Sequence, residues 1–547
     1  MSAIPQPVMA MVDRYFEPLL VWFSEKVYAE LIARAGNHLL VNLHDKLDFG
    51  FLEETCAPFH HTSGPGTRPT HTVPRMVRAL LVKYLFDWSL RQLEFQIRYN
   101  LIVKWFVGYG VLDAGPDHST LQRFEDWVRE HQHRVFFDEV LHQIDEEFPE
   151  ERQQPQIGDT YAMHADAAKE ALVRLIRHTC ERILGELASM SPAAHQCVVG
   201  KLDRVTLFGP EDEPSYFRMS SDERKKQLRN TVVGALQLIQ LVREQLAAHA
   251  SLTEDECQVI VNWLGCLEKI LGDEVEIQRN AEGQVERVTR LPKNERGSYR
   301  IGSATDPDAT YRVHGENKVD FGYNVNVAAT VNFVREIRAD TGAQPDAVAI
   351  PDLLEAQIEH HDTVPDKFIY DAAAGNGKTH AAVEEATDGQ TQLVAPLISN
   401  GKDAERFTPA DFTLSDDGDT LTCPNGQTTD TAYSAGNSEG RNFHFPASQC
   451  EGCPLWEDCR GTEAEPGKPR RVFVSDYHSQ RDAARAYSET DEFKADMKLR
   501  PNIERIIAGI TRHNGGRRAR CRGRYKSDFQ AKMNATAYNI KRWFRLS

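Results

Sequence analysis

The chain has 547 residues, of which 41% are hydrophobic and 27% are charged, enough for several domains with cores of their own. Acidic side chains outnumber Lys and Arg by 81 to 64, so the net charge is −17. A protein that coats nucleic acid with a uniformly basic surface is therefore excluded, because the chain as a whole repels polyanions.

The N-terminal forty residues contain apolar patches, but charged residues interrupt them and no basic segment precedes them. The sequence therefore predicts no signal peptide. The densest apolar stretch, 101–112, is far shorter than the ~20 residues of a membrane helix. We expect a cytoplasmic protein, in which the five singly placed cysteines are reduced thiols rather than disulfides: Cys56, Cys180, Cys197, Cys257 and Cys266.

Several short helices are predicted in the N-terminal part of the chain. Apolar residues recur at helical spacing in 76–85, Ser89 and Gln92 match a capping box, and another helix is expected after Asp117. Such helices are typical of helix-turn-helix DNA-binding regions, and equally of small helical bundles. We interpret residues 1–150 as a helical DNA-binding region.

Strand and helix patterns alternate in the middle of the chain. Residues 157–167 alternate as a strand with Asp159 near its start, and a helical pattern follows within about 169–300. Residues 319–331 alternate with period two, and 367–370 form a short apolar run. The fold class expected is α/β, with a sheet interrupted by a helical insertion.

Three carboxylates have settings that suit a site. Asp159 lies in the first predicted strand, and Asp371 ends an apolar run before a loop of small residues, where α/β sheets place ligand sites. Glu504 lies at the border of an isoleucine stripe in a helix that begins near Pro501. Each acid alone is more typical of a cap or a solvated side chain, so the functional interpretation depends on their joint setting.

Residues 372–379, Ala-Ala-Ala-Gly-Asn-Gly-Lys-Thr, carry a competing motif. With alanine in place of the first glycine they fit a P-loop after a strand, which would make the protein an NTPase. Asp371 would then lie at the mouth of the phosphate cradle, and no later apolar run ends in a Mg²⁺-binding aspartate. The alternative for Lys378 is a contact with a DNA phosphate.

A cysteine cluster lies in the loop-rich residues 399–470. The spacing of Cys423, Cys450, Cys453 and Cys459 can close a tetrahedral Zn²⁺ site, and we expect too few apolar residues there for a core. His444 is an alternative to Cys423 as a ligand. An iron–sulfur cluster or reduced thiols without a metal are the other interpretations.

The C-terminal segment is strongly basic. Residues 500–547 carry 13 Lys and Arg against two acids, a local charge of +11, so the rest of the chain carries −28. Glycines between the arginines let the backbone follow a phosphate chain, and arginine suits bidentate phosphate contacts. We expect seven residues to contact DNA: Arg512, Arg517, Arg518, Arg520, Arg522, Arg524 and Lys526. A disordered loop without a ligand is the alternative.

Four blocks of the sequence together resemble the DDE transposases of bacterial insertion sequences. They are the residues around Asp159, the pair of segments 305–309 and 321–325, the strand with Asp371, and Asn502-Ile503-Glu504-Arg505 before the arginines. The resemblance runs from about Phe59 to Trp543. The chain departs from the commonest pattern after Asp371, where three alanines replace the frequent Gly-Tyr.

The resemblance implies an RNase H-like domain with a mixed sheet, in which Asp159, Asp371 and Glu504 hold Mg²⁺ or Mn²⁺. Two such ions can activate a water or a 3′-hydroxyl and stabilise a leaving 3′-oxygen. The implied reaction is cleavage at the element's ends followed by strand transfer to target DNA. Similar transposases carry a comparable cysteine cluster between the second aspartate and the glutamate, which suggests a structural role for Zn²⁺.

The expected organisation has four parts. Residues 1–150 form the helical region, 151–398 the first part of the catalytic domain with its insertion, 399–470 the zinc-bearing insertion, and 471–547 the glutamate helix with the basic segment. The expected partner is double-stranded DNA in the nucleoid, bound by a homodimer or higher homo-oligomer. The alternative is a domesticated, sequence-specific DNA-binding protein that no longer cuts.

Overall fold

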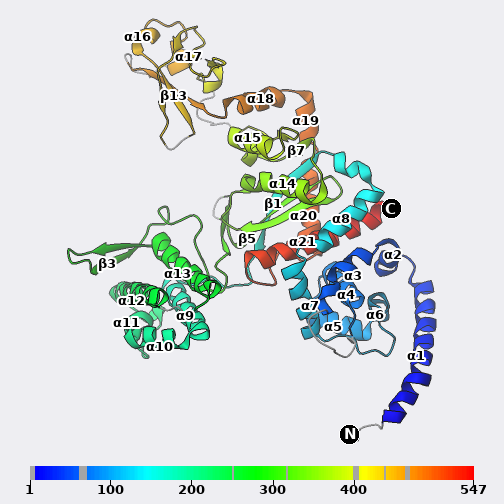
Figure 1. Ribbon diagram of the computed structural model, residues 1–547. Helices are drawn as coiled ribbons and strands as arrows, with labels where there is room; N and C mark the ends of the chain where they lie inside the picture. Colours follow the sequence, from blue (N-terminus) through cyan, green and yellow to red (C-terminus); the bar gives the residue numbers. More distant parts are fainter. Residues whose placement is uncertain are drawn as a thin grey trace.

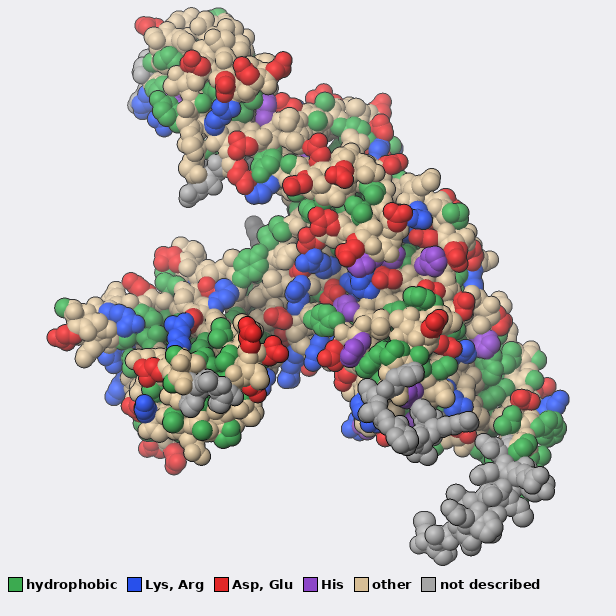
Figure 2. Space-filling view, in the orientation of Figure 1, with side chains coloured by type: hydrophobic (Ala, Val, Ile, Leu, Met, Phe, Trp, Pro, Cys, Tyr) green, Lys and Arg blue, Asp and Glu red, His purple; other side chains and the backbone are tan. Residues whose placement is uncertain are grey.

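The N-terminal region is helical, and a central sheet with its helices follows it (Figure 1). Two further lobes extend from the sheet, one made of α9 to α13 with a hairpin and the other of short strands (Figures 1 and 2). The computed structural model describes residues 6–60, 71–248, 252–315, 318–397, 406–436, 439–461 and 468–547.

The N-terminal helices confirm the pattern expected for residues 75–150. Ser89 and Gln92 form the predicted capping box of α5, and Asp117 accepts the Thr120 N–H at the start of α7. The helices are α1 (Gln6–Ala35), α2 (Leu39–Lys46), α3 (Gly50–Cys56), α4 (Val73–Leu85), α5 (Leu90–Tyr99), α6 (Leu101–Val107), α7 (His118–His131) and α8 (Val135–Glu147).

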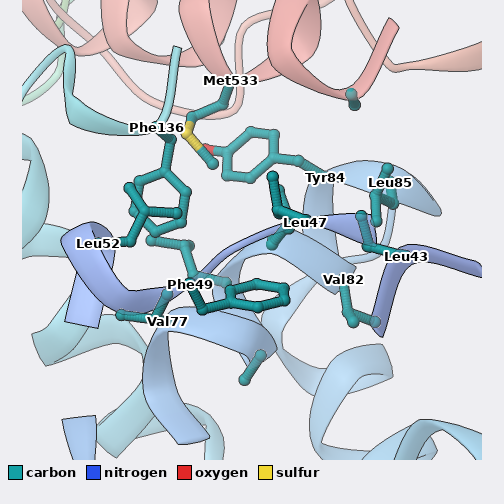
Figure 3. Close-up of a cluster of buried hydrophobic side chains, with 14 of the residues drawn as sticks. Leu43, Leu47, Phe49, Leu52, Val77, Val82, Tyr84, Leu85, Phe136 and Met533 are labelled. Atoms are coloured by element: carbon teal, nitrogen blue, oxygen red, sulfur yellow. The ribbon is translucent and has the colours of Figure 1, made fainter. Parts of the chain in front are cut away.

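The last helix, α21 (Arg524–Leu546), joins this region to the rest of the molecule. Its Phe529, Met533 and Ile540 belong to the same buried core as the N-terminal helices. Figure 3 shows Met533 above Tyr84 and Phe136 in this core. Because Ala531 and Ala535 of the same helix pack against the central sheet, α21 is buried from two sides.

The central sheet has six strands in the order β4-β5-β1-β7-β8, with β6 also paired to β5. β1 is antiparallel to β5 and parallel to β7, and β7 is parallel to β8. The sheet is therefore mixed, as expected. The strands are β1 (Gln156–His164), β4 (Thr310–His314), β5 (Lys318–Ala329), β6 (Val334–Thr341), β7 (Lys367–Ile369) and β8 (Gln392–Val394).

Helices cover both faces of the sheet (Figure 1). α14 (Ile350–His361) and α15 (Gly377–Ala386) pack on the face of Phe368 and Tyr370. α20 (Pro501–His513) and α21 pack on the face of Ile157 and Ile369. The two faces belong to alternate residues of β1 and β7, as the period of a strand requires.

A helical lobe is inserted between β1 and β4, with its own core. It contains the predicted helical pattern and ends in a hairpin of β2 (Val275–Arg279) and β3 (Val285–Arg290). The helices are α9 (Leu172–Met190), α10 (Pro192–Lys201), α11 (Arg204–Phe208), α12 (Ser221–Ala248) and α13 (Glu254–Glu274).

The cysteine-bearing segment folds into two small sheets around buried Phe412, Leu421, Phe443 and Val472. The expectation that this segment has too few apolar residues for a core is therefore wrong. The apolar residues of this segment lie in very short strands. A core therefore forms only where these separate strands pack together. The elements are β9 (Thr413–Leu414), β10 (Leu421–Thr422), β11 (Thr428–Thr429), β12 (Ala432–Ser434), β13 (Gly440–Phe445), α16 (Ala447–Cys450), α17 (Trp456–Arg460) and β14 (Arg470–Ser475), followed by α18 (His478–Ser488) and α19 (Asp491–Met497).

Candidate active site

The register of two parallel strands places Asp159 beside Asp371. Ile157 of β1 is paired with Ile369 of β7, so each aspartate lies two residues beyond this pair. Residues two apart on a strand share a face, and neighbouring strands are about 4.8 Å apart. Both carboxylates therefore lie on the face that α20 covers.

Gly158 makes room for the neighbouring strand on the opposite face. A Cβ at this position would lie 2.6 Å from the ring of Phe368 and 2.7 Å from that of Tyr370. The two aromatic rings cover the backbone of β1 beside Asp159 and are buried. The position of the carboxylate therefore depends on a glycine that the sequence places immediately before it.

α20 carries Glu504 to the same place. Ile503, Ile506 and Ile510 are fully buried against the sheet, as the predicted stripe requires, and Pro501 occupies the first turn. Glu504 lies at the border of this stripe with 71% of its side chain exposed. The helix thus packs beneath the sheet while its first-turn glutamate stays accessible.

Arg500 connects all three acids. Its Nη2 lies 3.4 Å from an Asp159 oxygen and 3.7 Å from an Asp371 oxygen, and its Nη1 lies 3.9 Å from a Glu504 oxygen. The buried Nε of Arg500 has no hydrogen-bond partner. The structure therefore brings the three acids around one positive group, although Asp159 and Glu504 are 345 positions apart in the sequence.

The three carboxylates differ in their surroundings. Burial raises the pKa of Asp159, and the nearby Asp371 and Asp346 add to this, while the Thr160 N–H and Arg500 oppose it. Asp371 accepts a hydrogen bond from the Ala373 N–H at 2.9 Å and is partly exposed. An added positive charge beside Asp159 would therefore favour its ionised form.

Asp346 is a further acid near the site that sequence reasoning missed. It accepts a hydrogen bond from Asn324 at 2.8 Å and pairs with Arg312 at 3.3 Å, and Arg312 also donates to Thr160 of β1. Asp346 follows Pro345 in a short turn before α14. No local pattern marks it, because its place beside β1 depends on strand β5.

Three carboxylates that surround one positive group provide the oxygen ligands that Mg²⁺ and Mn²⁺ prefer. The oxygen donors suit a divalent cation, although in this structure the three carboxylates are arranged around Arg500. Across the described ranges, no three His, Cys, Asp or Glu side chains form a preformed metal-binding group. In this arrangement Arg500 supplies the positive charge, and Asp159, Asp371 and Glu504 are the residues that would hold the metal.

Backbone atoms of neighbouring segments pack closely against the loop that carries the P-loop-like motif. A Cβ at Gly375 would lie 1.9 Å from the Pro396 carbonyl oxygen, and one at Gly377 would lie 2.6 Å from that of Tyr477. These close approaches account for both glycines without a bound phosphate. Lys378 is exposed and forms an ion pair with Glu439 at 2.7 Å, in the cysteine-bearing lobe.

The arginine segment, residues 512–526, is ordered along the end of β1. The His164 N–H donates to the Arg517 carbonyl at 2.9 Å, and the Ala519 N–H donates to the His164 carbonyl at 2.8 Å. Ala519 is buried, whereas Arg517 and Arg518 are exposed. Backbone pairing with the sheet therefore directs these arginine side chains outward, and the expected alternative of a disordered loop is wrong.

The arginines of this segment differ in their partners. Arg520 pairs with Asp87 and donates to the Trp88 carbonyl, so it anchors the segment to the α4–α5 turn. Arg517 and Arg522 donate to backbone carbonyls, and Arg524 lies 3.6 Å from Asp340. Among the residues that the structure describes, no ion pair involves the remaining three: Arg512, Arg518 and Lys526.

The four predicted zinc ligands line one small cavity of about 30 Å³. The Gln427 N–H donates to the Cys423 sulfur at 3.3 Å. Burial raises the pKa of Cys450, and the neighbouring Cys423 and Cys453 raise it further, against Arg460. Cysteine thiolates are donors that Zn²⁺ prefers, but among the described residues these four do not form a preformed metal-binding group. His444 faces Tyr433, with the ring centroids 4.8 Å apart.

Two family models match the chain. A transposase DDE domain matches residues 422–544, and a transposase domain of the DUF772 family matches residues 29–127. The first match includes the four cysteines, Glu504 and the arginine segment, while Asp159 and Asp371 lie outside both. No curated protein and no solved structure matches the chain.

Both matches describe transposase domains: one lies in the N-terminal helical region, and the other begins in the cysteine-bearing segment and extends to the last helix. The two matched stretches together support a DDE transposase of insertion-sequence type. Among the described helices, none is long and apolar enough to cross a membrane.

Proposed function

We propose that the chain cuts DNA at the ends of its own element and joins the freed ends to target DNA, with Asp159, Asp371 and Glu504 as metal ligands in an RNase H-like domain. The observation that carries this proposal is the convergence of the three acids on Arg500. Bound Mg²⁺ or Mn²⁺ would supply the charge that activates a hydroxyl and stabilises a leaving oxygen.

In this proposal the carboxylates, Arg500 and the exposed arginines have separate roles. The carboxylates of β1, of the turn after β7 and of α20 form the site on one face of the sheet, and Glu504 is the most exposed of them. Arg500 lies at the centre, where its guanidinium can donate hydrogen bonds to a DNA phosphate. The exposed arginines beside β1 would contact the phosphates of the same duplex.

The test replaces each acid by its amide: Asp159→Asn, Asp371→Asn and Glu504→Gln. We expect strand cleavage of a duplex with the element's end to fall at least ~10³-fold in each variant, because several kcal/mol of transition-state stabilisation are lost. Binding to the same duplex should change little. Asp320→Asn is the matched control, since this acid of β5 lies 3.8 Å from His164 and away from Arg500.

A variant that keeps wild-type cleavage would remove its acid from the site. Wild-type protein that binds element ends but never cuts in Mg²⁺ or Mn²⁺ would favour the domesticated DNA-binding protein. ATP hydrolysis that disappears in Lys378→Ala would instead support the NTPase, against the filled loop.

We also propose that Cys423, Cys450, Cys453 and Cys459 hold one structural Zn²⁺. Purified protein should contain about one zinc per chain, and Cys453→Ser should lose it and increase amide exchange over 421–459, because the metal there supports only a small core. Elemental analysis and hydrogen exchange measure both effects. Cys197→Ser, at an exposed cysteine elsewhere, is the control. Zinc-free wild-type protein with unchanged exchange would contradict the proposal.

A further inference from the structure

A large hollow lies in the inserted helical lobe. It has a volume of about 1560 Å³ and lies between α9, α11, α12 and β3. Pockets for small molecules usually enclose about 300–1,000 Å³. The hollow is therefore larger than a site for one nucleotide or cofactor, and its size suits part of a macromolecule.

Positive charge is concentrated in this hollow. Residues 169–300 carry 19 Lys and Arg against 20 Asp and Glu, so the lobe as a whole is almost neutral. Nine of the basic residues line the hollow, but only two acids do, Glu181 and Glu286. The lobe therefore segregates its charges, which is the electrostatic footprint of a polyanion site.

Five of these basic side chains have no carboxylate partner among the described residues: Arg204, Arg224, Lys226, Arg229 and Arg287. Arg224 donates to the Tyr216 carbonyl at 3.1 Å, and Arg229 donates to the Val285 carbonyl at 2.7 Å. Such bonds to neutral carbonyls fix the guanidinium groups without cancelling their charge. Positioned, uncompensated guanidiniums are suited to phosphate oxygens.

The lobe is attached to the arginine segment at both of its connections. Arg522 donates to the Asp166 carbonyl at 3.0 Å on one side. On the other side, the Gly523 N–H donates to Asp306 at 3.2 Å and the Arg524 N–H donates to Asp308 at 2.8 Å. A duplex that contacts the arginine segment therefore meets a surface that is fixed to the base of the lobe.

We propose that this hollow is a second DNA-binding surface, which holds the phosphate backbone without reading sequence. The inference rests on the proposed function, since it gives the lobe the same DNA as its ligand. Phosphate contacts by Lys and Arg release counterions, so each contact contributes about 0.9 to the slope of log K against log salt.

The experiment compares two triple variants of the full chain. Arg204→Gln, Lys226→Gln and Arg287→Gln remove three exposed, unpaired charges from the hollow. Lys201→Gln, Arg218→Gln and Lys293→Gln remove three exposed charges of the same lobe that do not line it. Fluorescence anisotropy with an element-end duplex and a random duplex is measured at several salt concentrations, and circular dichroism checks the fold.

We expect the hollow variant to lower the magnitude of the salt slope by up to about 2.7, equally for both duplexes, and the control variant to change it little. Equal slopes for the hollow variant and the wild type would overturn the proposal, and would leave an acidic protein as the ligand of the hollow. Loss of cleavage in the acid variants tests the proposed function separately, because those residues lie outside the lobe.

Discussion

The arginine segment and the hollow of the inserted lobe are both basic, but they obtain their charge in opposite ways. The arginine segment is one contiguous run, in which Arg520 pairs with Asp87, Arg522 lies 3.7 Å from Asp166 and Arg524 lies 3.6 Å from Asp340. The hollow collects basic residues from α9, α11, α12 and β3, and five have no carboxylate partner in the described structure. A run of arginines in a sequence therefore overstates the charge available to a ligand, and scattered arginines understate it.

The largest expected effect concerns the support of the arginine segment. Asp528, at the start of α21, pairs with Lys532 at 3.0 Å, contacts His133 at 2.8 Å and accepts the Ala339 N–H at 2.8 Å. Asp528→Asn should lower the free energy of unfolding by about 3 kcal/mol, because the buried Lys532 then keeps only Glu336, 3.5 Å away, as a carboxylate partner. Urea unfolding measures the change, and Lys526→Gln, an exposed neighbour, should stay within about 0.5 kcal/mol.

The same ion pair makes stability depend on pH. Burial alone would raise the pKa of Asp528, but Lys532, His133 and the Ala339 N–H outweigh it and hold the pKa well below its usual range. Asp528 therefore contributes fully to the free energy of unfolding above about pH 3.9, the ordinary pKa of an aspartate. This contribution is lost as the pH falls towards the depressed pKa of Asp528 in the folded protein. If wild type and Asp528→Asn lost stability in parallel on acidification, this role of Asp528 would be excluded.

A smaller effect is expected at the anchor between the arginine segment and the N-terminal helices. Arg520→Gln should weaken local stability by about 1–2 kcal/mol, since it removes a half-exposed ion pair and a hydrogen bond to Trp88. The salt slope of DNA binding should change little. Hydrogen exchange of the α4–α5 turn measures the first effect. If Arg520→Gln greatly lowered the salt slope of DNA binding and left hydrogen exchange of the α4–α5 turn unchanged, Arg520 would contact DNA rather than Asp87.

The smallest effects are expected at the free charges of the arginine segment. Each of Arg512→Gln, Arg518→Gln and Lys526→Gln should lower the magnitude of the salt slope by about 0.9. The loss should be the same for element-end and random duplexes, since phosphate contacts carry no sequence information. Changes of exposed residues in α4 to α7 should instead reduce the preference for element ends. An unchanged slope in all three variants would leave the hollow as the main basic surface.

Local patterns in the sequence determined most of the elements that carry the site. The apolar run before Asp371, the alternation around Asp159 and the isoleucine stripe beside Glu504 each reflect burial on one face of a single element. Burial on one face has a fixed period in a strand or a helix. The sequence could therefore place these acids at the ends and borders of elements, and the basic segment after them.

Only the tertiary structure decided how the elements meet. Arg500 lies among three acids, Asp346 lies beside β1, and the cysteine-bearing lobe has a core of its own. Likewise, the partner of Arg520 is more than 400 residues away, and the hollow collects residues spread from 174 to 290. These contacts depend on strand register and on packing between distant segments. A local periodicity cannot encode them, because it fixes which face of an element is buried but not which element covers it.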